Sequence, residues 1–144
     1  MNFRFASTLS QRVLLGAALI GAGGLVACGG PNKYYVTGTG TSASADANIK
    51  VEKRETGNKL VTIDIQNLPP PDRVAEDAEA FVVWFTAKGQ PTQKAGHLQY
   101  DKDERVGKAE ATCAYDEFTV LVTAEESAEV GSPSNKIVIR QEVE

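Results

Sequence analysis

The chain has 144 residues, of which 42% are hydrophobic and 24% charged, and its formal net charge is −4. These fractions are ordinary for a globular protein and argue against a disordered chain and against a multi-pass membrane protein. The excess of acidic residues argues against nucleic-acid binding, which needs Lys and Arg opposite the phosphates. The length suits a single domain with a sizeable core.

Residues 1–27 have the features of an export signal, with two arginines, an apolar and small-residue run at 13–22, and small residues that lead to a cysteine. Leu25-Val26-Ala27-Cys28 resembles the lipobox of bacterial lipoproteins, where a signal peptidase cuts before a cysteine whose sulfur carries diacylglycerol. An uncleaved membrane anchor is the alternative. However, glycines interrupt the apolar run, and it is shorter than the roughly 20 residues that span a bilayer. We therefore predict a cleaved signal and lipidation of Cys28.

Lipidation at Cys28 would decide where the protein works, because a lipoprotein cysteine carries at least two acyl chains, such as palmitate, and two chains anchor a protein stably. Gly29 stands where an inner-membrane retention signal commonly has Asp, so the lipoprotein resemblance favours the periplasmic face of the outer membrane of the cell envelope. Arg4 and Arg12 leave with the signal, so 13 basic and 19 acidic residues remain, with a net charge of −6. We therefore expect the lipid, and not electrostatic attraction, to hold the protein at the membrane.

Residues 28–47 follow as the predicted lipidated cysteine and flexible linker. They are rich in Gly, Ser, Thr, Ala and Asn and have no apolar period, so they are expected to remain a flexible tether. Tyr34-Tyr35 lies within this tether. The pair either rests at the headgroup level of the membrane, which tyrosine favours, or belongs to a solvated linker.

From residue 48 onwards, short apolar runs alternate with polar residues, which is the pattern of half-buried strands. The run 81–85 is apolar on both faces and predicts a central strand covered on both sides, whereas the weaker run 106–112 is expected at an edge. Because no helix of ten or more residues is indicated, residues 48–144 are predicted to be all-β, an immunoglobulin-like antiparallel β-sandwich of about seven strands. The expected strands are 49–52, 61–66, 81–85, 96–100, 106–112, 118–123 and 137–139.

Part of this pattern also resembles a known family, over about residues 48–140. The residues that carry the likeness are Phe81 with Trp84, then Gly96-His97-Leu98, then Phe118 with Thr123 and Glu125, and finally Pro133-Ser134. Their order is similar to that in the extracytoplasmic C-terminal domain of membrane anti-sigma factors of the anti-sigma-K type. The resemblance implies an immunoglobulin-like sandwich. It does not imply sigma-factor binding, because the sequence lacks that family's sigma-binding helices and membrane helix.

The second cysteine, Cys113, has no internal disulfide partner once Cys28 carries lipid. A reactive thiol would need a basic partner, and nothing in the sequence places His97, the only histidine, beside it. Cys113 is therefore expected to be a buried structural residue. Transition-metal sites need several convergent ligands, so His97 is expected at the surface or a strand edge.

The remaining candidates also favour structural roles. Trp84 could stack against a ligand, but on a central strand it is more often a core residue. Asp101-Lys102-Asp103-Glu104 resembles the opening of a calcium loop, yet it carries extra positive charge and lacks the glycine at the sixth position. Paired carboxylates elsewhere are typical of solvated turns, and Ser132 and Ser134 have no evident histidine base. The sequence therefore predicts no catalytic residue, no cofactor-binding residue and no metal ligand.

Two functions from different classes follow from these residues. The first is a non-enzymatic envelope module that the lipid on Cys28 tethers to the membrane and that serves a structural role or contacts an envelope protein. The alternative is a small-ligand or metal binder that uses the strand around Trp84, His97 and the acidic turns. An enzyme is not expected, because no set of nucleophile, base and oxyanion donor can be assembled.

Overall fold

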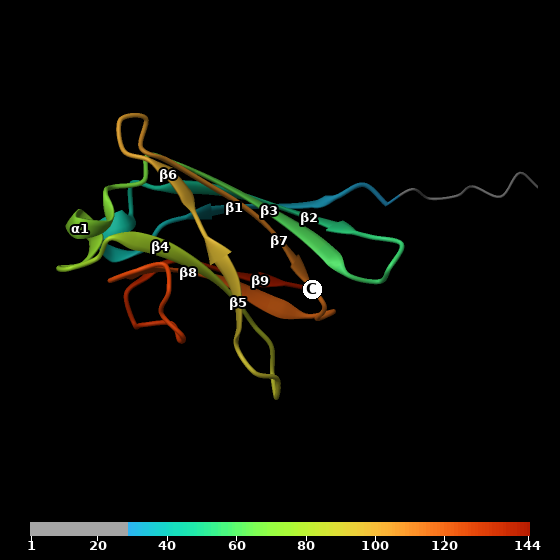
Figure 1. The fold of residues 1–144 in the computed structure, drawn as a ribbon. Helices are drawn as coiled ribbons and strands as arrows, with labels where there is room; N and C mark the ends of the chain where they lie inside the picture. Colours follow the sequence, from blue (N-terminus) through green and yellow to red (C-terminus); the bar gives the residue numbers. More distant parts are fainter. Residues whose placement is uncertain (1–28) are drawn as a thin grey trace, which may run out of the picture.

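The structure, a computed structural model, describes residues 29–144, so the predicted signal and Cys28 lie outside the described residues. Within this range the chain forms nine strands, one short helix and one 3-10 turn (Figure 1). The predicted all-β sandwich is confirmed, with nine strands where about seven were expected. In chain order the elements are β1 Asn32–Thr37, η1 Gly40–Ser42, β2 Asp46–Lys53, β3 Lys59–Gln66, α1 Pro71–Val74, β4 Ala80–Thr86, β5 Gln93–His97, β6 Gln99–Asp101, β7 Val106–Cys113, β8 Phe118–Glu125 and β9 Ile137–Val143.

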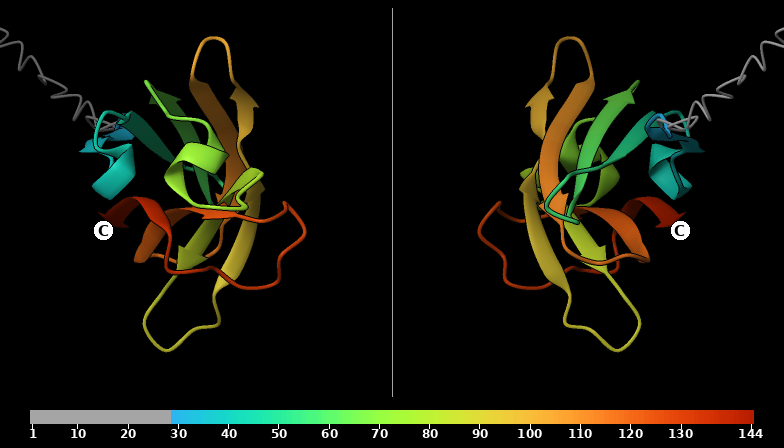
Figure 2. Two further views of the ribbon diagram at one scale, coloured as in Figure 1. Left: turned by 90° about the vertical axis from the view of Figure 1, so that its left-hand side faces the viewer. Right: turned by 90° about the vertical axis from the view of Figure 1, so that its right-hand side faces the viewer.

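The strands form two antiparallel sheets that pack face to face (Figures 1 and 2). Sheet A has the order β1-β2-β3-β7-β6, and sheet B has the order β5-β4-β8-β9. Without β1, sheet A has the A-B-E-D order of immunoglobulin-like sandwiches, and sheet B has the matching C′-C-F-G order. Strand β1 is an addition at the edge of sheet A.

Strand β1 occupies part of the segment that was expected to be a linker. It pairs antiparallel with β2 along its whole length. Tyr34 and Val36 pack against the core, whereas Tyr35 is exposed. The linker predicted over 28–47 is therefore wrong from Asn32 onwards, because the alternate residues of this strand bury apolar surface against the sandwich.

The connection between β1 and β2 is a tight, well-bonded turn. The amide of Gly38 donates to the carbonyl oxygen of Ala45 at 2.8 Å, and the amide of Ala45 donates to that of Ser42 at 2.8 Å. A Cβ added at Gly38 would lie 2.0 Å from the carbonyl oxygen of Ser42. The glycine is thus required by close backbone approach, and its presence does not indicate a flexible chain.

The strand expected at 96–100 is in fact two strands in different sheets. β5 pairs with β4 in sheet B, and β6 pairs with β7 in sheet A. Between them Leu98 is buried, and its amide donates to the carbonyl oxygen of Phe81 at 2.8 Å. Gly96 precedes the crossing with a φ of 143°, a conformation that favours glycine.

Strand β7, expected at an edge, lies instead between β3 and β6. The sequence there reads as weak because its inward residues are small. A Cβ added at Gly107 would lie 2.8 Å from Cδ1 of Leu98 and 3.1 Å from Cδ2 of Leu68. The glycine makes room for the two leucines. The strand was therefore wrongly expected at an edge because its small residues, which are needed for packing, give a weak strand pattern.

The core lies between the two sheets and is built from alternate residues of the paired strands. Two edge-to-face ring pairs, Phe81 with Tyr100 and Phe85 with Phe118, have centroids 5.3 Å apart. The largest of the completely buried core side chains between the sheets are Phe81, Phe85, Ile49, Ile63, Ile65, Leu68, Ile139, Val61, Val83 and Val120. Burial of this apolar surface is the main force that holds the sandwich together.

Candidate functional site

The sandwich has two unlike ends. We call the end at which β1 begins the proximal end, since it is nearest to Cys28 along the chain; it also carries the β2–β3, β4–β5 and β7–β8 turns. The opposite, distal end carries η1, α1 and the β6–β7 and β8–β9 connections (Figure 1). Any lipid on Cys28 would therefore be attached at the proximal end.

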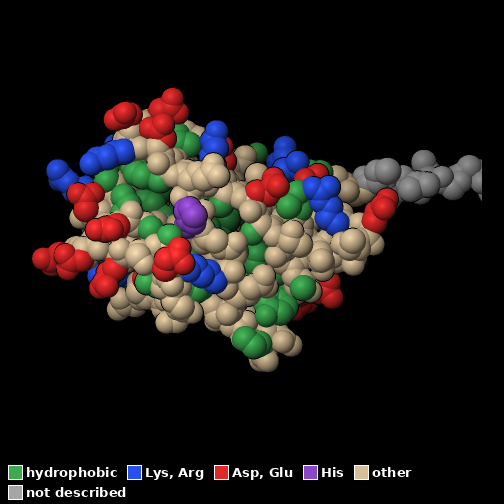
Figure 3. Space-filling model, viewed as in Figure 1, with side chains coloured by type: hydrophobic (Ala, Val, Ile, Leu, Met, Phe, Trp, Pro, Cys, Tyr) green, Lys and Arg blue, Asp and Glu red, His purple; other side chains and the backbone are tan. Residues whose placement is uncertain are grey.

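The distal end is acidic. In Figure 3 the carboxylate side chains gather at the end of the molecule where α1 lies. The connections and strand ends there, at 67–79, 101–105 and 126–136, contain nine Asp and Glu residues and four Lys and Arg residues. This concentration accounts for most of the negative charge of the domain and gives the distal end a field that attracts cationic surfaces.

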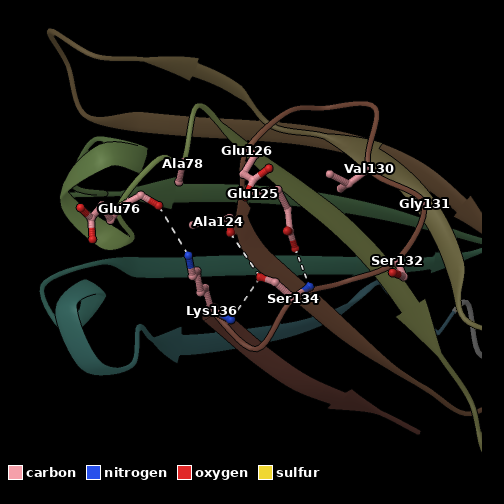
Figure 4. A pocket seen from close by; sticks show the side chains of 10 residues that line it. All are labelled: Glu76, Ala78, Ala124, Glu125, Glu126, Val130, Gly131, Ser132, Ser134 and Lys136. Carbon is pink, nitrogen blue, oxygen red and sulfur yellow. Dashed lines mark hydrogen bonds between the residues drawn. The ribbon is translucent and has the colours of Figure 1, made fainter.

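A hollow of about 330 Å³ opens at the distal end, between α1 and the β8–β9 loop (Figure 4). Its polar groups hold the loop in place. Glu125 is 6% exposed, and its Oε1 accepts a 2.8 Å hydrogen bond from the amide of Ser134. Nζ of Lys136 donates to the carbonyl oxygen of Glu76 at 3.5 Å. These contacts have structural roles, and none of them joins a nucleophile to a base.

Trp84 lies on the outer face of sheet B, beneath the β8–β9 loop. Its side chain is completely buried with Val82 and Leu121, and Val130 of the loop packs against this group. The indole Nε1–H donates to Oγ1 of Thr123 at 2.9 Å, so its one polar atom is satisfied. Trp84 is therefore a core residue, as predicted, and has no free face for a ligand.

The residues that carry the family resemblance meet through contacts of this kind. Trp84 bonds Thr123, and Glu125 bonds Ser134, so the aromatic strand, the strand β8 and the Pro-Ser loop are joined in one arrangement. The first contact joins β4 to β8 within sheet B, and the second fastens the β8–β9 loop at Ser134. These residues therefore have structural roles in this chain.

Cys113 is completely buried at the proximal end of β7. Burial raises the pKa of its thiol, an effect that the backbone hydrogen bond from Tyr115 and the charge of Lys59 only partly offset. His97 is exposed at the distal end of β5, on the other sheet. The structure therefore does not bring the thiol and the imidazole together.

Asp101 ends β6 and fixes the turn that follows. Its Oδ1 accepts hydrogen bonds of 2.9 Å from the amides of Asp103 and Glu104. The carboxylate is thus used as a turn cap. Within residues 29–144, no three His, Cys, Asp or Glu side chains are grouped as metal ligands, and no helix described there is long and apolar enough to cross a membrane.

A second hollow, of about 520 Å³, lies on the outer face of sheet A, where Tyr35 stands 77% exposed. Sequence reasoning treated Tyr35 as part of a linker and so missed this surface. The signal was present in the run 32–37, where Tyr34 and Val36 alternate with polar residues and with Tyr35. A six-residue alternation is short, and the surrounding Gly, Ser and Thr masked it.

Comparisons with known protein families, with curated proteins and with solved structures found no match to this chain.

Proposed function

We propose that this protein is a lipid-anchored module of the bacterial cell envelope with a non-enzymatic protein-interaction or structural role. The lipobox at Cys28 carries the anchor, and the short distance from Cys28 to the folded domain carries the orientation. Only Gly29, Gly30 and Pro31 separate Cys28 from the first residue of β1. A fully extended chain would place Asn32 within about 14 Å of the cysteine. A lipid on Cys28 would therefore hold the proximal end of the sandwich against the bilayer.

The distal end would then be the part of the domain that faces away from the membrane. Its acidic loops are the first surface that a neighbouring envelope protein meets, and their charge favours a partner with a basic face and speeds their encounter. The sequence motifs that resemble anti-sigma-K-type domains are carried over as a likeness in fold only, without the partner of that family. The lipobox and Gly29 support an outer-membrane, periplasmic location.

The anchor is tested by metabolic labelling with an alkyne fatty acid in a bacterial host. The full chain is expected to incorporate label and to fractionate with the envelope membranes. A Cys28→Ser variant is expected to lose the label and to remain unprocessed. The matched control is Cys113→Ala, which removes the buried thiol and should leave labelling unchanged. Equal labelling of wild type and Cys28→Ser would refute the anchor.

The interaction role needs a separate experiment. Photocrosslinkers placed at Asp103 and Glu129, on two distal loops, are compared with one at Asn58 in the proximal β2–β3 turn. Crosslinking in intact cells is expected to capture the same protein from both distal positions and lipid from the proximal position. A protein captured only at Asn58 would reverse the proposed orientation.

A further inference from the structure

Tyr35 differs from the other large apolar side chains of residues 29–144 in its exposure. At 77% it is the exposed large hydrophobic residue of this part of the chain, and it projects from the outer face of sheet A. Polar residues fill the neighbouring positions on this face, so no other apolar side chain packs over the ring. The ring is therefore available for contact with something outside the domain.

The residues around Tyr35 form a grid across three strands. In one row Tyr35 stands opposite Asn48, which stands opposite Asp64. In the adjacent row, two residues further along each strand, the outward residues are Thr37, Asp46 and Gln66. Side chains opposite each other on one sheet face lie about 5 Å apart, so the six groups form one small surface. All six line the hollow of about 520 Å³.

The polar groups of this grid are already oriented. Nε2 of Gln66 donates to Oδ1 of Asp64 at 2.5 Å, and Nζ of Lys108 lies 3.9 Å from the other oxygen of Asp64. Nδ2 of Asn67 donates to Oδ2 of Asp46 at 3.5 Å. A carboxylate can accept several hydrogen bonds and each of these two accepts one, so both retain capacity for donors from a ligand.

This chemistry excludes several kinds of ligand. Two carboxylates with one lysine repel phosphate, sulfate or carboxylate groups. Two carboxylates also fall short of the ligand set of a metal site, and no grouping of three is present among residues 29–144. A single aromatic ring among polar residues lacks the apolar centre on which protein interfaces depend. A neutral ligand with one apolar face and many hydroxyl groups satisfies all of these constraints.

We propose that the outer face of sheet A around Tyr35 is a binding site for a neutral saccharide. The C–H face of a pyranose ring stacks on the tyrosine ring, which offers an apolar body with a polar tip. The sugar hydroxyls donate to Asp46 and Asp64 and exchange hydrogen bonds with Asn48 and Gln66, and bonds to the charged acceptors are the stronger ones. The site stands on residues separate from those of the lipid anchor, so neither proposal depends on the other.

The test is isothermal titration of the full chain, purified in detergent, with cellohexaose, maltohexaose and chitohexaose. At least one of these is expected to bind. A Tyr35→Ala variant is expected to weaken that binding by about tenfold or more, the equivalent of about 1.4 kcal/mol. A Tyr35→Trp variant keeps an aromatic stacking surface and is expected to retain the binding. Thr62→Ala is the matched control, since Thr62 lies on the same outer face of β3 but does not line the hollow. Its affinity is expected to be unchanged.

Amide spectra of the ¹⁵N-labelled chain locate the contact. The sugar that binds is expected to shift the signals of Tyr35, Asn48 and Asp64, and to leave those of the distal loops in place. Three outcomes would overturn the proposal: no binding of any of the three sugars at about 10 mM, where a Kd near 1 mM would saturate the site; equal binding by Tyr35→Ala; or shifts at Tyr35 caused by phosphatidylethanolamine vesicles and not by sugar. The last outcome would assign the ring to the membrane.

Discussion

The outer faces of the two sheets have opposite characters, although each belongs to the same sandwich. On sheet B, Val82, Trp84 and Leu121 are buried beneath the β8–β9 loop. On sheet A, the outward residues of β1 to β3 are polar apart from half-buried Leu60 and from Tyr35, which stands free in solvent. One face is therefore a second, small core, and the other is a surface open to ligands. An aromatic ring stabilises the fold on the first face, whereas on the second it is free for recognition.

Removal of each ring should show this difference directly, with the largest expected effect. Trp84→Ala is expected to lower the free energy of unfolding by about 3–5 kcal/mol, because it leaves a cavity under the loop and an unbonded Thr123 hydroxyl. Tyr35→Ala is expected to change it by less than about 0.5 kcal/mol, as for other exposed positions. Urea unfolding followed by far-UV circular dichroism measures both. Equal losses would abolish the distinction between the faces.

A second prediction asks whether β1 belongs to the open face as an integral strand. Gly38→Ala is expected to cost about 1–3 kcal/mol, because the new Cβ meets the carbonyl oxygen of Ser42 and the β1–β2 turn must shift. Gly30→Ala is the control, since nothing lies within 4 Å of a Cβ there. Hydrogen exchange at the amides of β1 provides the local measurement. Unaltered protection of β1 in Gly38→Ala would mean that the strand does not depend on this turn.

The cover over sheet B can be loosened without any change to Trp84 itself. Glu125→Ala removes the acceptor for the amide of Ser134 and is expected to cost about 1–3 kcal/mol. Limited proteolysis should then cut the loop 126–136 faster than in the wild type. Glu126→Ala, at an exposed neighbouring position, is the control and should be cut at the wild-type rate. Similar cleavage of the two variants would show that Glu125 does not hold the loop.

The smallest expected effect concerns Cys113, whose side chain lies in the core between the two sheets and on neither outer face. Its raised pKa means that the folded state keeps the proton after the unfolded state has lost it. The free energy of unfolding is therefore expected to fall as the pH rises above about 8.5. Burial of Tyr100 acts in the same direction at higher pH. Between about pH 7.5 and pH 9.5, the urea midpoint of unfolding is expected to fall further for the wild type than for Cys113→Ala.

Much of this architecture could be predicted from the alternation of residue types. The alternating runs of β2 and β3 predicted strands with one buried face, and the uniformly apolar run of β4 predicted burial on both faces, as observed. Trp84 was predicted to lie in the core for the same reason. The sequence could not say what covers sheet B, because Val130 lies in a loop and its partners are set by tertiary structure.

The errors arose where local composition and tertiary packing disagree. Glycine and serine around η1 are typical of linkers, yet here they allow a tight turn, and the amide of Thr39 in it donates to the carbonyl oxygen of Val138 on β9 at 3.0 Å. The run 96–100 shows a single strand pattern, but the chain changes sheets at Leu98, and no periodicity reports such a crossing. The Tyr35 surface was missed because its polar residues come from three strands and converge only through their register.

The direction of β1 has a mechanical consequence. The strand begins at the proximal end and runs parallel to the long axis of the sandwich towards the distal end, and it pairs with β2 along its whole length. A pulling force between an anchor before Asn32 and a partner at the distal loops would act along the strand, so the paired residues would bear the load together in shear. A pull across the strand would break them one after another. Tension along β1 therefore loads all of its hydrogen bonds to β2 at once. The rate of forced unfolding in that direction is expected to be slow.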